Sequence, residues 1–404
     1  MNWQQVFLLE GKVQHYDWGG YEYLPQLLGL ANQAQQPYAE LWMGTHPRGE
    51  SMAWKNDHPI PLSELLESRP DWLGEGVVAQ FGPKLPYLFK VLDVRQMLSI
   101  QVHPNKAQAE SGFLRENQAG VSLSASHRNF KDDNHKPEVM VALTAFWLLH
   151  GFRHESEIAR LIEEVPEFGP LKPYFARKDI FELYKGVMEM PQAGVDAILE
   201  PLDNRLRPLA EGGALRKEQP EFWAARAFEQ LMPEGKAYDR GVFSIFLLNL
   251  VRLQPGQGIF QGAGVPHAYL EGVNVELMAN SDNVFRGGLT TKHIDVPALL
   301  AHLNFEAVTP RILEGERLSA AEWAYYTPAP DFQLNKIRLS AGEFYQARVS
   351  DGPEILIVIE GAVNPVGCQA FTRGQAFFVP AGHVYALHGM EDSLIFKALV
   401  PSLH

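Results

Sequence analysis

The segment Leu98–Asn105, L-S-I-Q-V-H-P-N, alternates apolar and polar residues. Because successive side chains on a strand point to opposite faces, this alternation predicts a strand with one core face and one polar face. The polar face would carry Ser99, Gln101 and His103, which supply a hydroxyl, an amide and an imidazole. A strand that is half core and half site is typical of a β-barrel that holds a ligand in its mouth.

Partners for Gln101 and His103 should lie in similar polar contexts. The candidates are Glu138, which ends the sequence N-H-K-P-E, and His267 in V-P-H-A. Two imidazoles, one carboxylate and one amide oxygen form a mixed ligand set that suits Zn²⁺ with one open position. Mn²⁺, Fe²⁺ or Co²⁺ would suit it nearly as well. In the alternative interpretation, both histidines are core or surface residues held by hydrogen bonds.

The segment Asn134–Glu138 packs two potential cations and a carboxylate into five residues. Pro137 restricts the residue before it to an extended conformation. His135 and Lys136 should therefore point to opposite sides, which places the Lys136 ammonium close to the Glu138 carboxylate. The alternative is a solvated turn.

Charged residues also occur within apolar or turn sequences. Glu276 lies in V-E-L-M, and a buried carboxylate must be paired or have a raised pKa. Arg286 follows in a turn after Asp282 and could clamp a phosphate or an enediolate oxygen, or form a structural pair with that aspartate. Lys90 in L-F-K-V-L must snorkel, pair or face a cavity.

The chain around these residues is mostly β in its first part. Strands are predicted over 85–92, 98–103 and 138–149, and Asn105 with Gln108 resembles a capping box that opens a helix through about residue 114. Between residues 155 and 235 the apolar residues recur at helical spacing three times, which predicts a helical insert.

Strand patterns return at 243–253 and 354–360. Residues 256–268 and 374–386 are identical at six of thirteen positions, at a constant offset of 118. Both copies read as strand, turn and strand, which indicates two copies of one β-barrel module. The second resembles half of the cupin signature, but Tyr385 stands where the first has His267. We therefore expect a metal in the first barrel only.

Composition limits the classes of function. At 404 residues the chain should form two or three domains, and its formal net charge of −13 argues against nucleic-acid binding. The single cysteine, Cys368, excludes an internal disulfide. No signal peptide is apparent, and the longest apolar run is too short to span a membrane. We expect a cytoplasmic protein with no membrane partner, and a monomer is the simplest expectation.

Together these motifs resemble the type I mannose-6-phosphate isomerases. The resemblance is carried by Y-D-W-G at 16–19, A-E-L-W-M-G-T-H-P at 39–47, S-I-Q-V-H-P-N-K at 99–106, K-D-D-N-H-K-P-E at 131–138, H-A-Y-L-E-G at 267–272 and V-E-L-M-A-N-S-D-N-V-F-R at 275–286.

The resemblance implies a mainly β fold with a helical insert. Its catalytic cupin-type jelly-roll barrel would span 1–154 and 236–325, a helical domain 155–235, and a second, metal-free barrel 326–404. It implies one zinc ion per chain, held by Gln101, His103, Glu138 and His267. It places in the substrate pocket Ser99, Lys90, His135, Lys136, Glu276, Asp282 and Arg286.

The family interconverts mannose 6-phosphate and fructose 6-phosphate. We expect a cis-enediol path with Glu276 as the first candidate for the proton shuttle, Lys136 the second and His135 the third. Arg286 would stabilise the enediolate or hold the phosphate. The main alternative is a sugar-binding cupin without catalysis, which would predict a broken ligand set. A cupin oxygenase would more usually carry a histidine-rich set.

Overall fold

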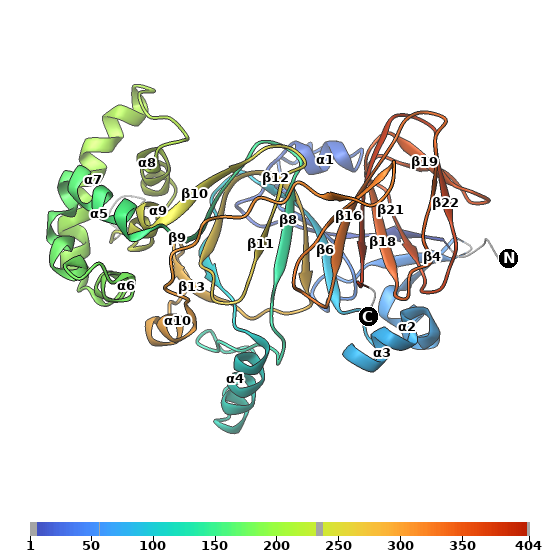
Figure 1. Cartoon of the computed structure of the whole chain (residues 1–404), viewed down its shortest axis with the longest axis horizontal. Coiled ribbons are helices and arrows are strands. Elements are labelled where there is room, and N and C mark those ends of the chain that lie inside the picture. The colour runs from blue at the N-terminus through green and yellow to red at the C-terminus, as the bar shows by residue number, and fades with distance from the viewer. Residues whose placement is uncertain (1–5, 56, 232–236, 402–404) are drawn as a thin grey trace.

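The computed structural model describes residues 6–55, 57–231 and 237–401. Three β-sheets form the body of the molecule, and a group of helices packs against one end of it (Figure 1). The expected mainly β fold with helices is confirmed. The first residues, on which the expected lack of a signal peptide depends, lie outside the described part.

The first sheet is organised around one long strand, β12 (His267–Ala279). The first half of β12 pairs with β7 (Ile100–Val102) and β9 (Phe146–Phe152). Its second half pairs with β6 (Tyr87–Val94) and β8 (Glu138–Ala142). The remaining strands of this sheet are β2 (Lys12–Gln14), β3 (Glu40–Met43), β10 (Leu248–Leu253), β11 (Gly258–Gln261) and β13 (Phe285–Gly288).

A β-bulge divides β12 into these two halves. Its register shifts between Tyr269 and Glu271, and Gly272 has a φ of 129°. Before the bulge, the even-numbered residues Ala268 and Leu270 pack into the core shared with the helices. After it, the odd-numbered residues Val273 and Val275 pack into the core shared with the neighbouring sheet. As bulges do next to many sites, this one re-aims the side chains that follow it.

Most of the predicted strands form. The segments predicted at 85–92 and 354–360 are β6 and β18 (Glu354–Glu360), and the segment at 138–149 is split by a bend into β8 and β9. The segment at 98–103 forms as β7 over three residues only, with Ser99 before it and His103 after it.

The prediction of a strand over 243–253 is wrong in its first half. Residues 241–247 form the helix α9 (Gly241–Leu247), and only then does β10 begin. Every residue of α9 is buried. A run that is apolar on all sides carries no period, so its sequence does not distinguish a buried strand from a buried helix.

The predicted helices form. The helix α4 (Lys106–Gln118) begins with the predicted capping box, in which Asn105 and Gln108 exchange two hydrogen bonds of 2.9 Å. The helices of the insert are α5 (Glu155–Glu164), α6 (Ile180–Glu189), α7 (Gln192–Glu211) and α8 (Pro220–Leu231). Their apolar faces share one core with α9, β7 and β9. The predicted end of the insert, residue 235, lies outside the described residues.

Both ends of the chain contribute to the second sheet. Its strands, in order, are β14 (Glu316–Arg317), β15 (Glu322–Tyr325), β16 (Gln333–Leu339), β23 (Ser393–Leu399), β18, β21 (Ala376–Val379), β1 (Phe7–Glu10), β4 (Met52–Lys55) and β5 (His58–Pro61). β1 pairs with β21, with Phe7 opposite Phe378. The division expected from the sequence assigns residues 1–154 and 326–404 to different barrels and does not predict that strands from the two pair.

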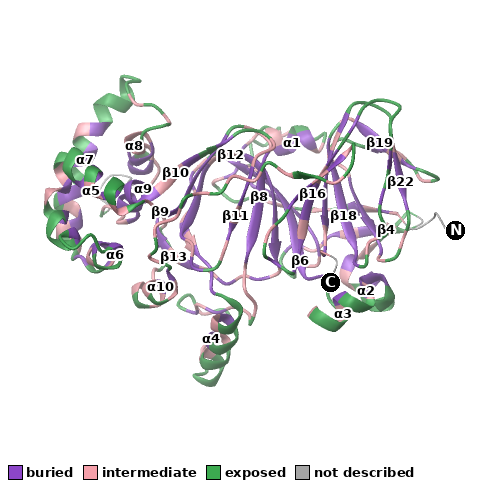
Figure 2. Ribbon diagram, in the orientation of Figure 1, coloured by how far each residue is buried: buried purple, intermediate pink, exposed green. Residues whose placement is uncertain are grey.

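The third sheet covers one face of the second. It consists of β17 (Phe344–Gln346), β22 (Ala386–Gly389), β19 (Ala362–Pro365) and β20 (Phe371–Thr372). An apolar core fills the space between these two sheets. The other face of the second sheet packs on the first sheet through a larger core, and these central strands are buried along most of their length (Figure 2).

The internal repeat is confirmed in the backbone. β11 and β21 occupy matching positions, 258–261 and 376–379, at the offset of 118. The shared glycines also match, since φ is 89° at Gly256 and 82° at Gly374, and 75° at Gly264 and 73° at Gly382. These left-handed turns explain why glycine stands at both positions in both copies.

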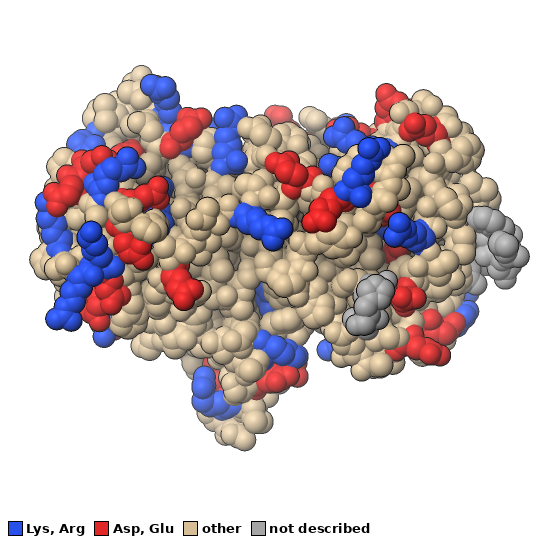
Figure 3. Space-filling view, in the orientation of Figure 1, with Lys and Arg blue, Asp and Glu red and all other residues tan. Residues whose placement is uncertain are grey.

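Acidic and basic side chains are intermixed on the face that Figure 3 shows. Among the described residues, none of the helices combines the length and the apolar character needed to cross a membrane.

The bulge in β12 leads to a stability prediction. A Cβ at Gly272 would lie 2.7 Å from Phe146 Cδ2 and would need a φ that residues with side chains rarely adopt. Gly272→Ala should therefore lower the free energy of unfolding by about 1–3 kcal/mol, measured by denaturant titration. Gly169→Ala is the control, because a Cβ there has nothing within 4 Å. Equal stability of the two variants would contradict the role given to the bulge.

Candidate functional site

A cavity of about 580 Å³ opens on the first sheet. Its walls come from β3, β6, β7, β8 and β12, and from the segments that precede β8 and β13. Both halves of β12 contribute, because the bulge turns His267 and Tyr269 from the first half and Glu276 and Met278 from the second half toward the same space.

Three buried side chains on this cavity form a group that can hold a metal ion. One ligand atom from each of His103, Glu138 and His267 lies within 4.8 Å of the others. His103 Nε2 is 3.4 Å from Glu138 Oε1, and His267 Nε2 is 3.3 Å from Glu138 Oε2. His267 and Glu138 are the first residues of β12 and β8, and His103 follows β7 directly, so three strand ends fix the group.

The hydrogen bonds of both imidazoles leave the Nε2 atoms free for a cation. His103 Nδ1 contacts the Asn283 carbonyl at 2.8 Å, and His267 Nδ1 contacts the Val265 carbonyl at 3.0 Å. A carbonyl only accepts, so each Nδ1 carries the proton and each Nε2 carries the lone pair. His103 Nε2 is buried without a hydrogen-bond partner in the described structure. Such an orphaned acceptor can bind a cation.

The charge states in this group also suit a metal. Burial lowers the pKa of His103 to about 4, helped by the Lys136 charge, so its imidazole is neutral. Burial raises the pKa of Glu138, but the nearby Lys136 charge opposes this shift, and the pKa lies well below its usual range. Imidazoles and carboxylates are ordinary ligands for zinc.

Gln101 lies beside the three buried residues. In the strand register it is opposite His267 on β12 and opposite Arg286 on β13. It also lines the cavity, so its amide oxygen can complete a four-residue ligand set.

A second polar layer lies behind the metal-binding group. His150 is opposite His267, and Gln261 is opposite Glu138. His150 Nδ1 and Gln261 Oε1 are 2.7 Å apart, which links the two ligand-bearing parts of the sheet. Local sequence patterns did not point to either residue.

A buried ion-pair network lies next to the metal-binding group. Glu276 is opposite Lys90 in the register of β12 and β6, and Lys90 Nζ is 3.0 Å from Glu276 Oε2 and 3.6 Å from Glu40 Oε2. Tyr269 donates a 2.9 Å hydrogen bond to Glu276 Oε1. Burial raises the pKa of Glu276, although the Lys90 charge opposes the shift. Lys90 therefore pairs across the cavity wall and does not snorkel to solvent.

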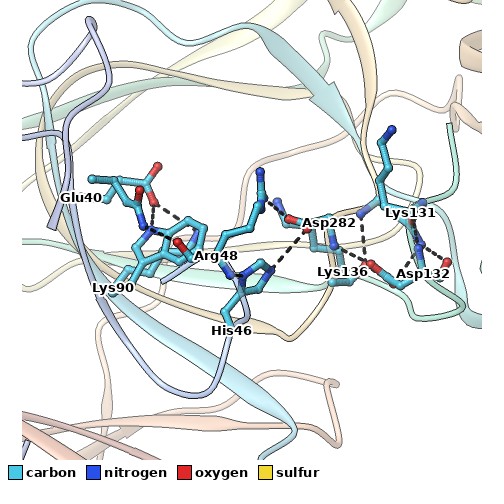
Figure 4. Close-up of polar contacts among 12 residues, drawn as sticks. Glu40, His46, Arg48, Lys90, Lys131, Asp132, Lys136 and Asp282 are labelled. Atoms are coloured by element: carbon cyan, nitrogen blue, oxygen red, sulfur yellow. Dashed lines mark hydrogen bonds and ion pairs between the residues drawn. The ribbon is translucent and has the colours of Figure 1, made fainter. Parts of the chain in front are cut away.

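The expected approach of Lys136 to Glu138 is present, with Lys136 Nζ 2.7 Å from Glu138 Oε1. Asp282 forms an ion pair with Arg48 and lies 3.4 Å from His46 Nε2 (Figure 4). Burial raises the pKa of Asp282, but the hydrogen bond from His46 and the nearby cations bring it down to about 2. Asp282 therefore pairs with Arg48, and the structural pair with Arg286 that the sequence left open is not formed.

The mouth of the cavity is rich in cations. Burial lowers the pKa of Arg286, and the structure gives its guanidinium no hydrogen bond or ion pair among the described side chains. Burial and the charge of Arg286 also lower the pKa of Lys131 and of Lys292. Lys131 Nζ also donates hydrogen bonds to the carbonyls of Leu123 and Ala125. Cations gathered at the mouth of a cavity are well placed to bind an anion.

Two predicted site residues lie elsewhere. Ser99 and His135 are absent from the described lining of the cavity. His135 Nε2 is 2.8 Å from Asp331 Oδ2, in a separate cavity formed with the segment before β16. Pro137 does set His135 and Lys136 on opposite sides, and that geometry carries His135 away from the metal-binding group.

Several lining residues were not assigned from the sequence. Glu40, Trp42, His46 and Arg48 line the cavity, together with Lys131, Tyr269 and Lys292. Glu40, Trp42 and His46 lie in the motif at 39–47. Glu40 is a charged residue in an apolar sequence, and Lys90 is a candidate for that same reason. Their contacts come from the pairing of β3 with β6, which local sequence does not reveal.

Comparison with known proteins gives a consistent family. A sequence profile of the type I phosphomannose isomerase catalytic domain matches residues 6–155. Mannose-6-phosphate isomerase of Escherichia coli (strain K12) is 40% identical over 361 residues, which cover 87% of this chain and 88% of that protein. The Homo sapiens mannose-6-phosphate isomerase is 34% identical, with 98% of each chain covered.

Solved structures agree. The crystal structure of mannose 6-phosphate isomerase from Salmonella typhimurium bound to substrate and zinc superposes with a TM-score of 0.87 at 34% identity, covering 98% of this chain and 100% of that one. With relatives this similar over nearly its whole length, the chain belongs to the mannose-6-phosphate isomerase family and is an isomerase.

Proposed function

We propose that this enzyme interconverts mannose 6-phosphate and fructose 6-phosphate with one zinc ion per chain. The observation that carries the proposal is the buried group of His103, Glu138 and His267, with an orphaned imidazole nitrogen, beside the Lys90–Glu276 pair. The cation-rich mouth of the same cavity suits a phosphorylated sugar.

Zinc would be held by Gln101, His103, Glu138 and His267. When bound, it would orient the substrate oxygens and stabilise negative charge on them. The intact ligand set supports catalysis over a sugar-binding module without catalysis, which would be expected to lack ligands. In the second copy of the repeat the position of His267 is Tyr385, whose hydroxyl donates a 2.6 Å hydrogen bond to Glu354. We therefore place the single metal in the first unit.

The domain boundaries follow the same proposal. A cupin-type catalytic barrel would comprise 1–154 and 236–325, the helical domain 155–235, and a metal-free cupin-like barrel 326–404. β1 pairs with β21 of the last of these units, and β4 and β5 extend the same sheet beyond β1, so these three strands would tie the two barrels together.

The cations divide by the part of the chain that carries them. Arg286 is opposite Gln101 in the strand register, which supports a role for its guanidinium near the reacting carbons. Lys131 and Lys292 lie instead in the irregular segments that precede β8 and α10 (Val296–His302). We assign Arg286 to the enediolate oxygens, and Lys131 and Lys292 to the phosphate.

The isomerisation moves a proton between C1 and C2 of the sugar. A base removes the proton from C2 of mannose 6-phosphate to give a cis-enediolate with its negative charge on O1. The O2 proton then moves to O1, and the conjugate acid of the base returns the first proton to C1, which gives fructose 6-phosphate. Glu276 is our choice for this base, because burial raises its pKa toward the working range and Tyr269 and Lys90 hold both of its oxygens. Lys136 is the second choice, and the position of His135 against Asp331 argues against the third.

Metal binding can be tested apart from activity. His103→Ala removes one ligand, and the purified variant should hold less than about one tenth of the zinc of the unchanged enzyme, because a zinc site with few protein ligands depends on each of them. His154→Ala is the control, since that side chain is 69% exposed. Zinc content is measured by elemental analysis after dialysis. A full zinc complement in His103→Ala would refute the ligand set.

The proton shuttle makes a separate prediction. Glu276→Gln keeps the shape of the side chain but removes the base, so kcat should fall by about 10²–10⁴-fold with zinc content unchanged. The measurement is a coupled assay with mannose 6-phosphate, alongside the exposed control Glu306→Gln. If the Glu276 variant turns over within threefold of the parent enzyme, the base is another group.

The two cation roles can be separated by kinetics. Lys292→Met should raise KM for mannose 6-phosphate by about tenfold and leave kcat almost unchanged, because a phosphate contact is the same in the ground and transition states. Arg286→Met should lower kcat, since its contact strengthens as charge develops. The reverse pattern would exchange the two assignments.

A further inference from the structure

Another cavity, of about 440 Å³, opens at the end of the core between the second and third sheets, and we call it the second cavity. Its floor is polar and consists of Glu322, Glu354, Asn335 and Lys397, all of which are buried. These residues come from β15, β18, β16 and β23, and the register of β16 and β23 sets Asn335 opposite Lys397. The floor therefore rests on four paired strands.

Hydrogen bonds hold the floor in a fixed arrangement. Lys397 Nζ is 2.7 Å from Glu322 Oε1 and 3.0 Å from Tyr345 Oη. Asn335 donates to Glu322 Oε1 at 2.7 Å, and Tyr385 donates to Glu354 Oε2 at 2.6 Å. Glu354 Oε1 lies 3.7 Å from Lys397 Nζ, beyond hydrogen-bond distance, so this oxygen retains capacity to accept a hydrogen bond.

Stability alone does not account for this network. Replacing a buried ion pair by apolar side chains of similar size is often neutral or stabilising. The adjoining core between these sheets is apolar and could have continued to this end of the molecule. Charged groups are instead retained where the core meets a cavity, as is typical of a binding pocket.

The repeat relates this cavity to the candidate active site. Tyr385 occupies the position of His267 at the offset of 118, and each of the two side chains reaches a buried glutamate beside a cavity. The second copy thus has the hydroxyl of Tyr385 where the first has the imidazole of His267, and both copies have polar groups beside a cavity.

The charges distinguish the ligands of the two cavities. In the first, cations outnumber carboxylates, as an anionic substrate requires. In the second, Lys397 and the exposed Arg348 are balanced by Glu322 and Glu354. An anion would meet two carboxylates, whereas hydroxyl groups can both donate to these oxygens and accept from Lys397 and Arg348.

The walls suit the carbon faces of a sugar. Tyr326, which is 47% exposed, stands at the rim, and Leu318, Phe332 and Leu399 complete the apolar lining. We propose that this cavity binds a neutral polyhydroxylated molecule, an unphosphorylated monosaccharide or polyol, at a site separate from the isomerase centre.

Methyl NMR on the zinc-loaded full-length enzyme can locate such binding. D-mannose, D-fructose and mannitol are each titrated into protein with ¹³C-labelled Leu and Val methyl groups. Methyl signals of Leu318, Leu399 and Val349 report on the second cavity, and those of Leu88 and Leu98 report on the first. At least one of the three compounds should shift the signals of the second cavity saturably, with a Kd on the order of 1 mM.

Two variants test the assignment. Glu354→Gln and the rim change Tyr326→Ala should each weaken binding at the second cavity by fivefold or more, with isomerase kcat unchanged. Tyr326→Ala is the safer variant for folding, and Tyr174→Ala, another exposed tyrosine, is the matched control. Absence of a saturable shift for all three compounds, or undiminished binding in both variants, would overturn the proposal. So would tighter binding of mannose 6-phosphate than of the neutral sugars at these methyl groups.

Discussion

The bulge in β12 is the constraint on which the site depends. Side chains of a regular strand alternate between faces, so residues 267 and 276 of one unbroken strand would point to opposite sides. The shift between Tyr269 and Glu271, with Gly272 in a conformation that favours glycine, turns the second half of the strand. One strand thereby supplies a proposed metal ligand and the proposed base to the same cavity, while each half keeps an apolar face on its own core.

The charges in the cavity are held in place by the strands around it. Lys90 is surrounded by Glu276, Glu40 and the ring of Trp42, so its ammonium is compensated even though the side chain is buried. Glu138 is compensated by Lys136. A buried charge is tolerated only when it is paired and hydrogen-bonded. Removing one partner leaves the other charge buried and uncompensated, which destabilises the fold. The site is therefore preorganised for charge that develops on a substrate.

Sequence patterns predicted the features that depend on residues close together in the chain. The capping box at Asn105, the helical insert, β6 and β18 follow from spacing, and the repeated glycines of the two copies follow from the turns they form. The ligand candidates were found because polar residues on a strand or in a repeat are informative. The helix α9 is fully buried, so its sequence shows no helical period. For His135, the local sequence predicts that it points away from Lys136, but its contact with Asp331 comes from a distant part of the chain. The pairing of β1 with β21, and the contacts of Glu40, His150 and Gln261, depend on strands far apart in the chain.

Diffraction at the zinc absorption edge, from crystals of the zinc-loaded enzyme, tests the central claim most directly. The account predicts one anomalous peak per chain, at about 2.0–2.2 Å from His103 Nε2, His267 Nε2 and a Glu138 oxygen, with the Gln101 amide oxygen also in contact. A peak among Glu322, Glu354 and Tyr385, or a peak in the first cavity that does not touch the two histidines, would contradict it.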